Sequence, residues 1–255
     1  GVEDLKLPRD HADDHASPLP RSWVRPLRPG GAVSPAPTRR QPAFGLGLVG
    51  PVTAEQMAAI EDFLADRGAE VHHEVSPLAH PSLLELLNDR GYRPIELTTV
   101  MYRPLRLDDS LWSHPDKRLL VRRGTRLDTD LYAGTSARGW SHMPELGSFF
   151  EEMGRVAVEA EGYIPLLVEK DGEPIAAGAM SLAEGVGLLA GASTVPEARR
   201  QGAQNILLAH RLRYAAEHGC DLAMMCAAPG SDSQRNAERM GFRIAYTRIK
   251  WRLPC

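Results

Sequence analysis

The most informative ten residues of the chain are Val195-Pro196-Glu197-Ala198-Arg199-Arg200-Gln201-Gly202-Ala203-Gln204. The apolar residues 186–195 that lead into them predict a strand, and apolar residues at the spacing i, i+4 and i+7 after them predict a long helix. The backbone amides and the dipole at the start of such a helix favour a bound anion. Gly202 lets the backbone approach a phosphate closely, and Arg199 and Arg200 add positive charge. The stretch therefore predicts a phosphate-binding loop; the alternative is an ordinary strand–helix turn whose arginines are solvated.

Helices and strands alternate on the C-terminal side of this loop. The long helix has His218 in its last turn and Gly219 at the position of a left-handed C-cap. An apolar strand at 221–227, a helix at 231–240 and a final strand at 242–253 follow. The predicted order is therefore strand, helix, strand, helix, strand.

The same order of elements recurs nearer the N-terminus. It begins with a short Gly-rich strand at 44–49 and a helix whose first residues, Thr53-Ala54-Glu55-Gln56, have the capping-box form. A strand at 70–75, a helix that starts at Pro81 and a strand at 95–102 complete the series.

Glycine landmarks have nearly the same spacing in the two series. Gly68 and Gly91 are 23 residues apart, and Gly219 and Gly241 are 22 residues apart. A recurring unit of this size indicates duplication. The side chains between the glycines differ widely, so the repeat is one of architecture rather than of residue identity.

Only the C-terminal copy has a front half. It consists of a predicted strand at 119–123, helices at 128–139 and 145–160, and a hairpin of strands at 163–170 and 174–182 that turns at Asp171-Gly172. We therefore expect four segments: a Pro-rich irregular lead-in at 1–42, a half-domain at 43–105, a linker at 106–116 and a complete domain at 117–255.

The lead-in is distinguished by its proline content, because eight of the 20 prolines lie in the first 42 residues. Proline fixes φ and has no amide hydrogen, so this segment can hold little helix or central strand. We expect it to form irregular chain along the surface, or structure that the sequence does not reveal.

Composition excludes several classes of protein. The chain has 255 residues, 43% of them hydrophobic, which is enough to fill a core and excludes global disorder. No apolar stretch reaches the length of a membrane helix, and no secretory signal is visible. The net charge of −3 gives no electrostatic reason to expect nucleic acid or a membrane as partner. Three cysteines are too few for a disulfide framework, so we expect a reducing, cytoplasmic setting.

The arrangement resembles the GNAT superfamily of N-acetyltransferases. The pyrophosphate loop of that family has the form Arg/Gln-x-x-Gly-x-Gly/Ala; Arg199 and Gly202 fill its first and fourth positions, and Gln204 departs from it. Gly241-Phe242 matches a pair that the family places before its last strands. The resemblance implies an α/β (α+β) GNAT fold, with a mixed twisted sheet flanked by helices and a partial N-terminal copy of the same fold. The chain would thus be a tandem GNAT protein.

The resemblance also implies that only the C-terminal copy binds coenzyme A. In the first copy Gly50-Pro51-Val52-Thr53-Ala54 takes the place of the loop; it has no arginine, and Pro51 has no amide hydrogen to donate.

Acetyl-CoA or coenzyme A is the co-substrate that the resemblance implies, with no metal. The strand that ends at Val195 would splay from the strand that starts at Asp221, and its backbone would bind the pantetheine arm. The next helix would lie beside that arm, although capping of this helix is the alternative role of Ser231, and the two roles can coexist. The implied cofactor-binding residues are Ser193, Thr194, Val195, Arg199, Arg200, Gln201, Gly202, Ala203, Gln204, Ser231 and Asn236.

Acetyl transfer to an amine requires removal of a proton from the amine, polarisation of the thioester carbonyl and a proton for the leaving thiolate. Strand amides near Ser193 are candidates for the polarising group. Many family members carry an acidic tyrosine four residues before the Gly-Phe pair, but Ala237 occupies that position here. Tyr246, Ser233 and an ordered water are the alternatives. Glu184 is a candidate base, with a solvated surface carboxylate as its other interpretation.

Three further features bear on the chemistry. Glu169 is a second candidate base with the same alternative, and Cys226 is either a covalent acetyl carrier or inert packing. Trp140 and His142 follow the first helix of the complete domain, where the family binds its acceptor; the alternative is that Trp140 packs beneath the loop.

The sequence thus predicts an N-acetyltransferase that moves an acetyl group from acetyl-CoA to a small-molecule amine by direct attack in a ternary complex. The alternatives are a non-catalytic CoA-binding or CoA-sensing protein, and an acyltransferase with a longer acyl or carrier-protein donor. We expect a monomer or a homodimer.

Overall fold

A computed structural model describes residues 25–27, 31–33, 42–107, 118–143, 147–160 and 162–254. The helices are α1 (Ala54–Ala65), α2 (Pro81–Asp89), α3 (Thr129–Gly139), α4 (Gly147–Glu159), α5 (Ala203–Glu217) and α6 (Asp232–Arg239), with 3-10 helices η1 (Arg126–Asp128) and η3 (Pro196–Ala198). The strands are β1 (Arg25–Leu27), β2 (Gly31–Val33), β3 (Pro42–Phe44), β4 (His72–Val75), β5 (Arg93–Pro104), β6 (Leu119–Arg123), β7 (Tyr163–Lys170), β8 (Glu173–Ala183), β9 (Val186–Thr194), β10 (Leu222–Ala227) and β11 (Arg243–Arg252).

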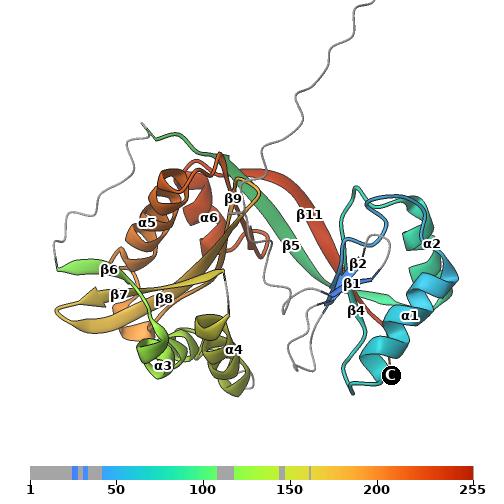
Figure 1. The fold of residues 1–255 in the computed structure, drawn as a ribbon, viewed down its shortest axis with the longest axis horizontal. Helices are drawn as coiled ribbons and strands as arrows, with labels where there is room; N and C mark the ends of the chain where they lie inside the picture. Colours follow the sequence, from blue (N-terminus) through green and yellow to red (C-terminus); the bar gives the residue numbers. More distant parts are fainter. Residues whose placement is uncertain are drawn as a thin grey trace, which may run out of the picture.

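The described strands form one mostly antiparallel sheet, in the order β1-β2-β3-β4-β11-β5-β10-β9-β8-β7-β6. Helices α5 and α6 pack on one face of its C-terminal part around a core that includes Leu207, Leu212 and Ala237. Helices α3 and α4 cover the opposite face over β7 and β8. Helices α1 and α2 pack against β4 and the end of β11 (Figure 1). The sheet flanked by helices confirms the predicted α/β fold class.

Two series of elements have the same order and the same local pairing. The series β3-α1-β4-α2-β5 matches β9-α5-β10-α6-β11. Within each, the first two strands are parallel and joined across a helix, whereas the last strand runs antiparallel to its neighbours. The architectural repeat predicted from the glycine spacing is therefore present.

The last strands of the two series are exchanged. Strand β11 lies between β4 and β5, and β5 lies between β11 and β10, so each series inserts its last strand beside the middle strand of the other. Figure 1 shows β5 and β11 side by side, crossing from one group of helices to the other. Neither series has a complete sheet by itself, and the two share one continuous sheet.

Two sequence expectations need correction. The predicted strand at 44–49 is wrong beyond Phe44, because Gly45 and Gly47 adopt left-handed φ values of 78° and 80° and turn the chain. The described residues of the lead-in are also not irregular: β1, β2 and the first residue of β3 are strand. Proline is compatible with both places, because Pro26 lies on the edge strand and Pro42 begins its strand. The remaining lead-in and linker residues lie outside the described ranges.

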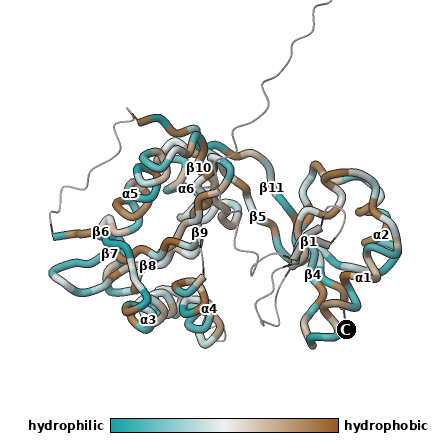
Figure 2. The backbone as a smooth tube through the Cα atoms, viewed as in Figure 1, coloured by the Kyte–Doolittle hydropathy of each residue, from teal (hydrophilic) through white to brown (hydrophobic). Residues whose placement is uncertain are grey.

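Hydrophobic and hydrophilic residues alternate along the helices (Figure 2). Accordingly, none of the helices in the described ranges is both long enough and apolar enough to cross a membrane.

Candidate functional site

The strands β9 and β10 pair over only part of their length. Their parallel register runs from Val186 opposite Leu222 to Leu189 opposite Met225. Beyond these residues β9 continues to Thr194 and β10 to Ala227 without pairing to each other. The strands therefore diverge where the resemblance to the GNAT superfamily implied a splay.

A β-bulge bends β9 within this divergent part. Ala190 pairs with Ala179 of β8 and Ser193 pairs with Ala177, so Gly191 and Ala192 together face the single residue Gly178. Gly191 has a φ of 59°, a left-handed conformation that glycine adopts without strain. A bulge disrupts the regular ladder and re-aims the backbone groups around it. The bulge was not predicted, although an isolated glycine within a strand is a sequence signal for such a feature.

The loop from β9 to α5 ends in a helix start that has no side-chain cap. Gly202 is the N-cap residue, with a φ of 85° and no capping side chain. Within the described chain no hydrogen bond uses the amides of Gly202, Ala203 or Gln204. These donors lie at the positive end of the helix dipole and can bind an anion.

Side chains of the loop tie it to β9 and α3. The side-chain amide of Gln204 donates from Nε2 to Thr194 Oγ1 at 2.7 Å, and the Arg199 guanidinium donates to the Gly139 carbonyl at 3.1 Å. Lys170 Nζ donates to Gln201 Oε1 at 2.5 Å. The residue that departs from the family motif, Gln204, thus bridges the helix start to the end of β9.

Arginines from the β9–α5 loop and from α6 lie near the same place. Arg235 hydrogen-bonds Asp232 at 2.7 Å and lowers the pKa of that carboxyl, and Arg200 and Arg239 add to the effect from nearby. The backbone of Arg200 has a φ of 63°, a left-handed conformation that is strained for a residue other than glycine. Arg200 was predicted from the sequence, but Arg235 and Arg239 were not, because their positions on α6 carry no motif.

The loop before α1, which corresponds to this loop in the first series, differs in how its backbone amides are paired. Thr53 Oγ1 accepts from the Gln56 amide while Gln56 Oε1 accepts from the Thr53 amide, which is the predicted capping box. Ser82 Oγ accepts from the Val52 amide at 2.8 Å. Three amide donors at this helix start are therefore already paired.

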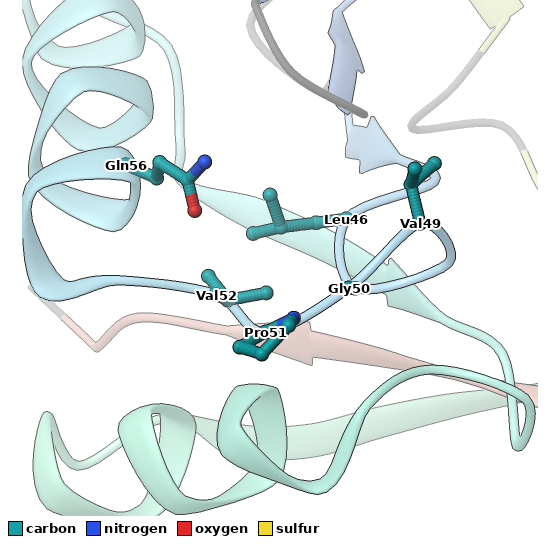
Figure 3. Close-up of a pocket in the computed structure, with 7 residues that line it drawn as sticks. Leu46, Val49, Gly50, Pro51, Val52 and Gln56 are labelled. Atoms are coloured by element: carbon teal, nitrogen blue, oxygen red, sulfur yellow. The ribbon is translucent and has the colours of Figure 1, made fainter.

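A small pocket lies beside the first-series loop (Figure 3). Its lining is mostly apolar, and the Gln56 side chain points toward Leu46 and Val52. The pocket volume of about 90 Å³ is well below the roughly 300–1,000 Å³ of ligand pockets. Fewer backbone amides are therefore free here than at the start of α5, and the pocket has no space for a nucleotide.

The start of α6 combines capping with proximity to the divergent strands. Ser231 Oγ accepts from the Gln234 amide, so its capping role is present. Asn236 Oδ1 accepts from Arg239, and Ser233 is exposed. Ala237 is fully buried in the core beneath the helix. Alanine offers no acidic group at this position.

The structure separates the other catalytic candidates. Tyr246 of β11 and Cys226 of β10 both pair with Val100 of β5, one on each side of that strand. Strand β5 therefore runs between the two candidates. Glu184 is in the turn before β9, roughly 30 Å from Thr194 along the strand, and is not brought together with the loop.

The surroundings of Glu169 and Cys226 bear on their candidate catalytic roles. Glu169 accepts from Arg122 Nε at 2.6 Å and is thus part of an ion pair. Burial raises the pKa of the Cys226 thiol, which keeps it protonated and a weak nucleophile.

Aromatic side chains gather where α3 meets the end of β9. Trp140 stacks on Phe150, with 4.9 Å between the ring centroids, and lies 5.6 Å from the His142 ring. Gly139 packs so closely on Ser193 that a Cβ atom there would lie 2.3 Å from Ser193 Oγ. Trp140 thus packs against helix α4 and stays partly exposed, and His142 is exposed.

Comparison with known proteins identifies the fold. The model of the acetyltransferase (GNAT) family matches residues 130–242. A GCN5-related N-acetyltransferase from Kribbella flavida superposes with a TM-score of 0.64 at 19% identity, covering 91% of this chain and 90% of that one. A GCN5-related N-acetyltransferase from Sphaerobacter thermophilus gives 0.62 at 17% identity, covering 87% and 75%.

A tandem GNAT protein from the clavulanic acid biosynthesis pathway gives a TM-score of 0.61 at 15% identity, covering 89% of this chain and 80% of that one. A comparison with curated protein sequences finds no match. Among the described residues there is no group of three or more side chains of the metal-binding types.

Proposed function

We propose that the protein is an acetyl-CoA-dependent N-acetyltransferase, on the premise that residues 130–242 match the model of the acetyltransferase (GNAT) family and that the fold is that of GCN5-related N-acetyltransferases. Its acceptor is the amine of a small molecule, which attacks the thioester directly while both substrates are bound. The observation that carries the proposal is the uncapped start of α5 at the mouth of the divergent strands β9 and β10.

The residues at this place fit a coenzyme A. The amides of Gly202, Ala203 and Gln204 hold the pyrophosphate, and Arg200 with Arg235 and Arg239 supplies positive charge for the remaining phosphate. The pantetheine arm runs between the diverging strands, where the backbone of residues 193–195 is its partner. When bound, the acetyl thioester supplies the electrophile.

In the transfer step the amine nitrogen forms a bond to the thioester carbonyl carbon, and the bond from that carbon to sulfur breaks. Backbone amides near the β9 bulge stabilise the negative charge that develops on the carbonyl oxygen. The amine loses a proton to solvent or to a basic group, and the leaving thiolate takes one from Tyr246, Ser233 or a water. Trp140 and His142 contact the acceptor at the end of α3.

Substitution of Gly202 tests the cofactor loop. Gly202→Asp places a negative charge beside the free amides, so we expect acetyl-CoA to bind about tenfold or more weakly by isothermal titration calorimetry. Gly50→Asp is the matched control in the first-series loop, where a side chain would meet nothing within 4 Å. It should leave the affinity and a stoichiometry of one unchanged. Failure of the wild-type protein to bind acetyl-CoA or CoA at tens of micromolar would refute the proposal.

A non-catalytic CoA-binding protein is the second candidate, and buried Ala237 at the usual acid position favours it. Release of free thiol from acetyl-CoA across a broad panel of amines distinguishes the two. Tight binding without any thiol release would identify a CoA-binding protein rather than an enzyme.

A further inference from the structure

A buried arginine lies in the middle of α5, directly beside the bulge of β9. Arg211 is 3% exposed, and among the described residues the ionisable groups that act on it are the phenols Tyr132 and Tyr163 rather than a carboxylate. Its Nη1 donates to the carbonyl of Ala179 at 3.2 Å and to that of Ala190 at 3.4 Å. Burial lowers the pKa of this guanidinium to about 10, which leaves it a cation at neutral pH. An unpaired charge at this depth is costly, so its retention calls for a physical role.

The two carbonyls belong to the residue pair where the regular β8–β9 ladder stops. Ala179 and Ala190 face each other, and the two bulged residues, Gly191 and Ala192, follow immediately on β9. Arg211 therefore clamps both strands at the edge of the bulge and fixes where the backbone departs from the ladder.

In the described part of the chain, Arg211 is surrounded by dipoles rather than by a counter-charge. Tyr132 and Tyr163 lie close enough to act on it electrostatically, and burial raises the pKa of Tyr163 to about 12 and that of Tyr132 further. Both phenols are thus neutral. A Cβ atom on Gly191 would lie 3.5 Å from the Tyr163 hydroxyl, which places this group against the bulge itself.

Arg211 polarises the peptide group between Ala190 and Gly191. The Ala190 carbonyl and the Gly191 amide are one peptide group, so a cation that binds the carbonyl makes the amide hydrogen a stronger donor. The positive charge also acts through a dry interior, where electrostatic effects are larger than in water.

We propose that Arg211 is a positioning residue for acetyl transfer: it fixes the β9 bulge and polarises the Ala190–Gly191 peptide, so that the strand amides polarise the thioester carbonyl. This inference rests on the proposed function. Arg211 acts through the backbone and does not itself contact the substrate.

The test measures the bound thioester directly and needs no knowledge of the acceptor. Acetyl-CoA labelled with ¹³C at the carbonyl is bound to the full chain, and infrared difference spectra give the carbonyl stretching frequency. Polarisation moves this frequency below that of free acetyl-CoA. The shift should decrease in the order wild type, Arg211→Lys, Arg211→Gln, because lysine keeps the charge but reaches fewer carbonyls, whereas glutamine keeps a donor and loses the charge.

Arg213→Gln is the matched control, since Arg213 is an exposed neighbour on the same helix, paired with Glu217. It should keep the wild-type frequency. A purely structural role for Arg211 would change the affinity for acetyl-CoA but not the frequency of the fraction that binds.

The outcomes separate this inference from the proposed function. If Arg211→Gln binds acetyl-CoA and shows the wild-type frequency, the inference is wrong while the proposed function stands. If Arg211→Gln does not fold, Arg211→Lys decides, and an unchanged frequency in that variant overturns the inference. If the wild-type protein binds no acetyl-CoA, the proposed function itself fails.

Discussion

At the scale of single residues, the contact between Gly139 and β9 is the tightest in the candidate site. A Cβ atom at residue 139 would lie 2.4 Å from the Ser193 Cβ and 3.0 Å from the Thr194 amide nitrogen. The backbone amide cannot move aside as a flexible side chain would. The end of α3 is thereby held against the part of β9 that we assign to the pantetheine arm.

Gly139→Ala should therefore push α3 away from β9. We expect a loss of about 1–3 kcal/mol in the free energy of unfolding, measured with urea, together with weaker binding of acetyl-CoA. Gly134→Ala is the control on the same helix, where an added Cβ meets nothing within 4 Å. It should be neutral or stabilising, because alanine favours a helix interior. Equal effects of the two substitutions would contradict the packing argument.

His73 is a second residue whose environment has a measurable consequence. Burial, with a smaller contribution from His72, lowers its pKa from 6.5 to about 4. The Tyr92 hydroxyl donates to Glu61, so His73 Nε2 donates to the Tyr92 oxygen and the ring is neutral in the folded state. In the unfolded chain His73 takes up a proton near pH 6.5, whereas in the folded chain it does so only near pH 4.

Stability should consequently fall as the pH is lowered from 6.5 to 4, with His73 contributing up to about 3 kcal/mol of that loss. His73→Phe removes the titrating group and should flatten the pH dependence of the free energy of unfolding over this window. The same slope in the variant and the wild type would show that His73 does not titrate differently on folding.

At the scale of elements, the starts of α1 and α5 are the informative comparison, because one is capped by its own side chains and the other is not. Thr53→Ala removes the capping box of α1 and should lower the free energy of unfolding by about 1 kcal/mol. It frees an amide but supplies neither arginines nor space. Calorimetry should therefore still give one acetyl-CoA per chain with unchanged affinity; a second binding site would overturn the distinction between the two loops.

The elements were largely predictable because each carries a local signal. The strand at Tyr163–Lys170 and the capping box at Thr53 agree with expectation to the residue. The strand at 44–49 failed because apolar composition outweighed two glycines that turn the chain. Arg211 was missed although it occupies the apolar face of α5, between Leu208 and Ala215. A charged residue on such a face was the available signal.

At the scale of the whole molecule, the exchange of β5 and β11 was not predictable from the sequence. Both strands have ordinary strand composition, and nothing local specifies which neighbour each will pair with. Pairing depends on contacts between residues far apart in the chain, such as Glu74 of β4 with Arg248 of β11 at 2.5 Å. The likeness to the tandem GNAT protein extends over 89% of this chain, so the whole shared sheet, rather than one half, is the unit of comparison.

Because each series completes the sheet of the other, the two should unfold together. Leu87→Ala removes a fully buried side chain from the core beneath α2 and should cost about 2–5 kcal/mol. The exchanged strands transmit that loss to the second series, so a single calorimetric transition should move to lower temperature. The shift produced by bound acetyl-CoA, which acts only in the second series, should appear in the same transition.

Leu84→Ala is the control for this last test, since Leu84 lies on the exposed side of the same helix. Its effect on the transition should be small. Two separate transitions, only one of which responds to Leu87→Ala while only the other responds to acetyl-CoA, would mean that β5 and β11 do not couple the halves. A single transition that responds to both is what a shared sheet requires, because neither series can lose its strands without breaking the pairing of the other.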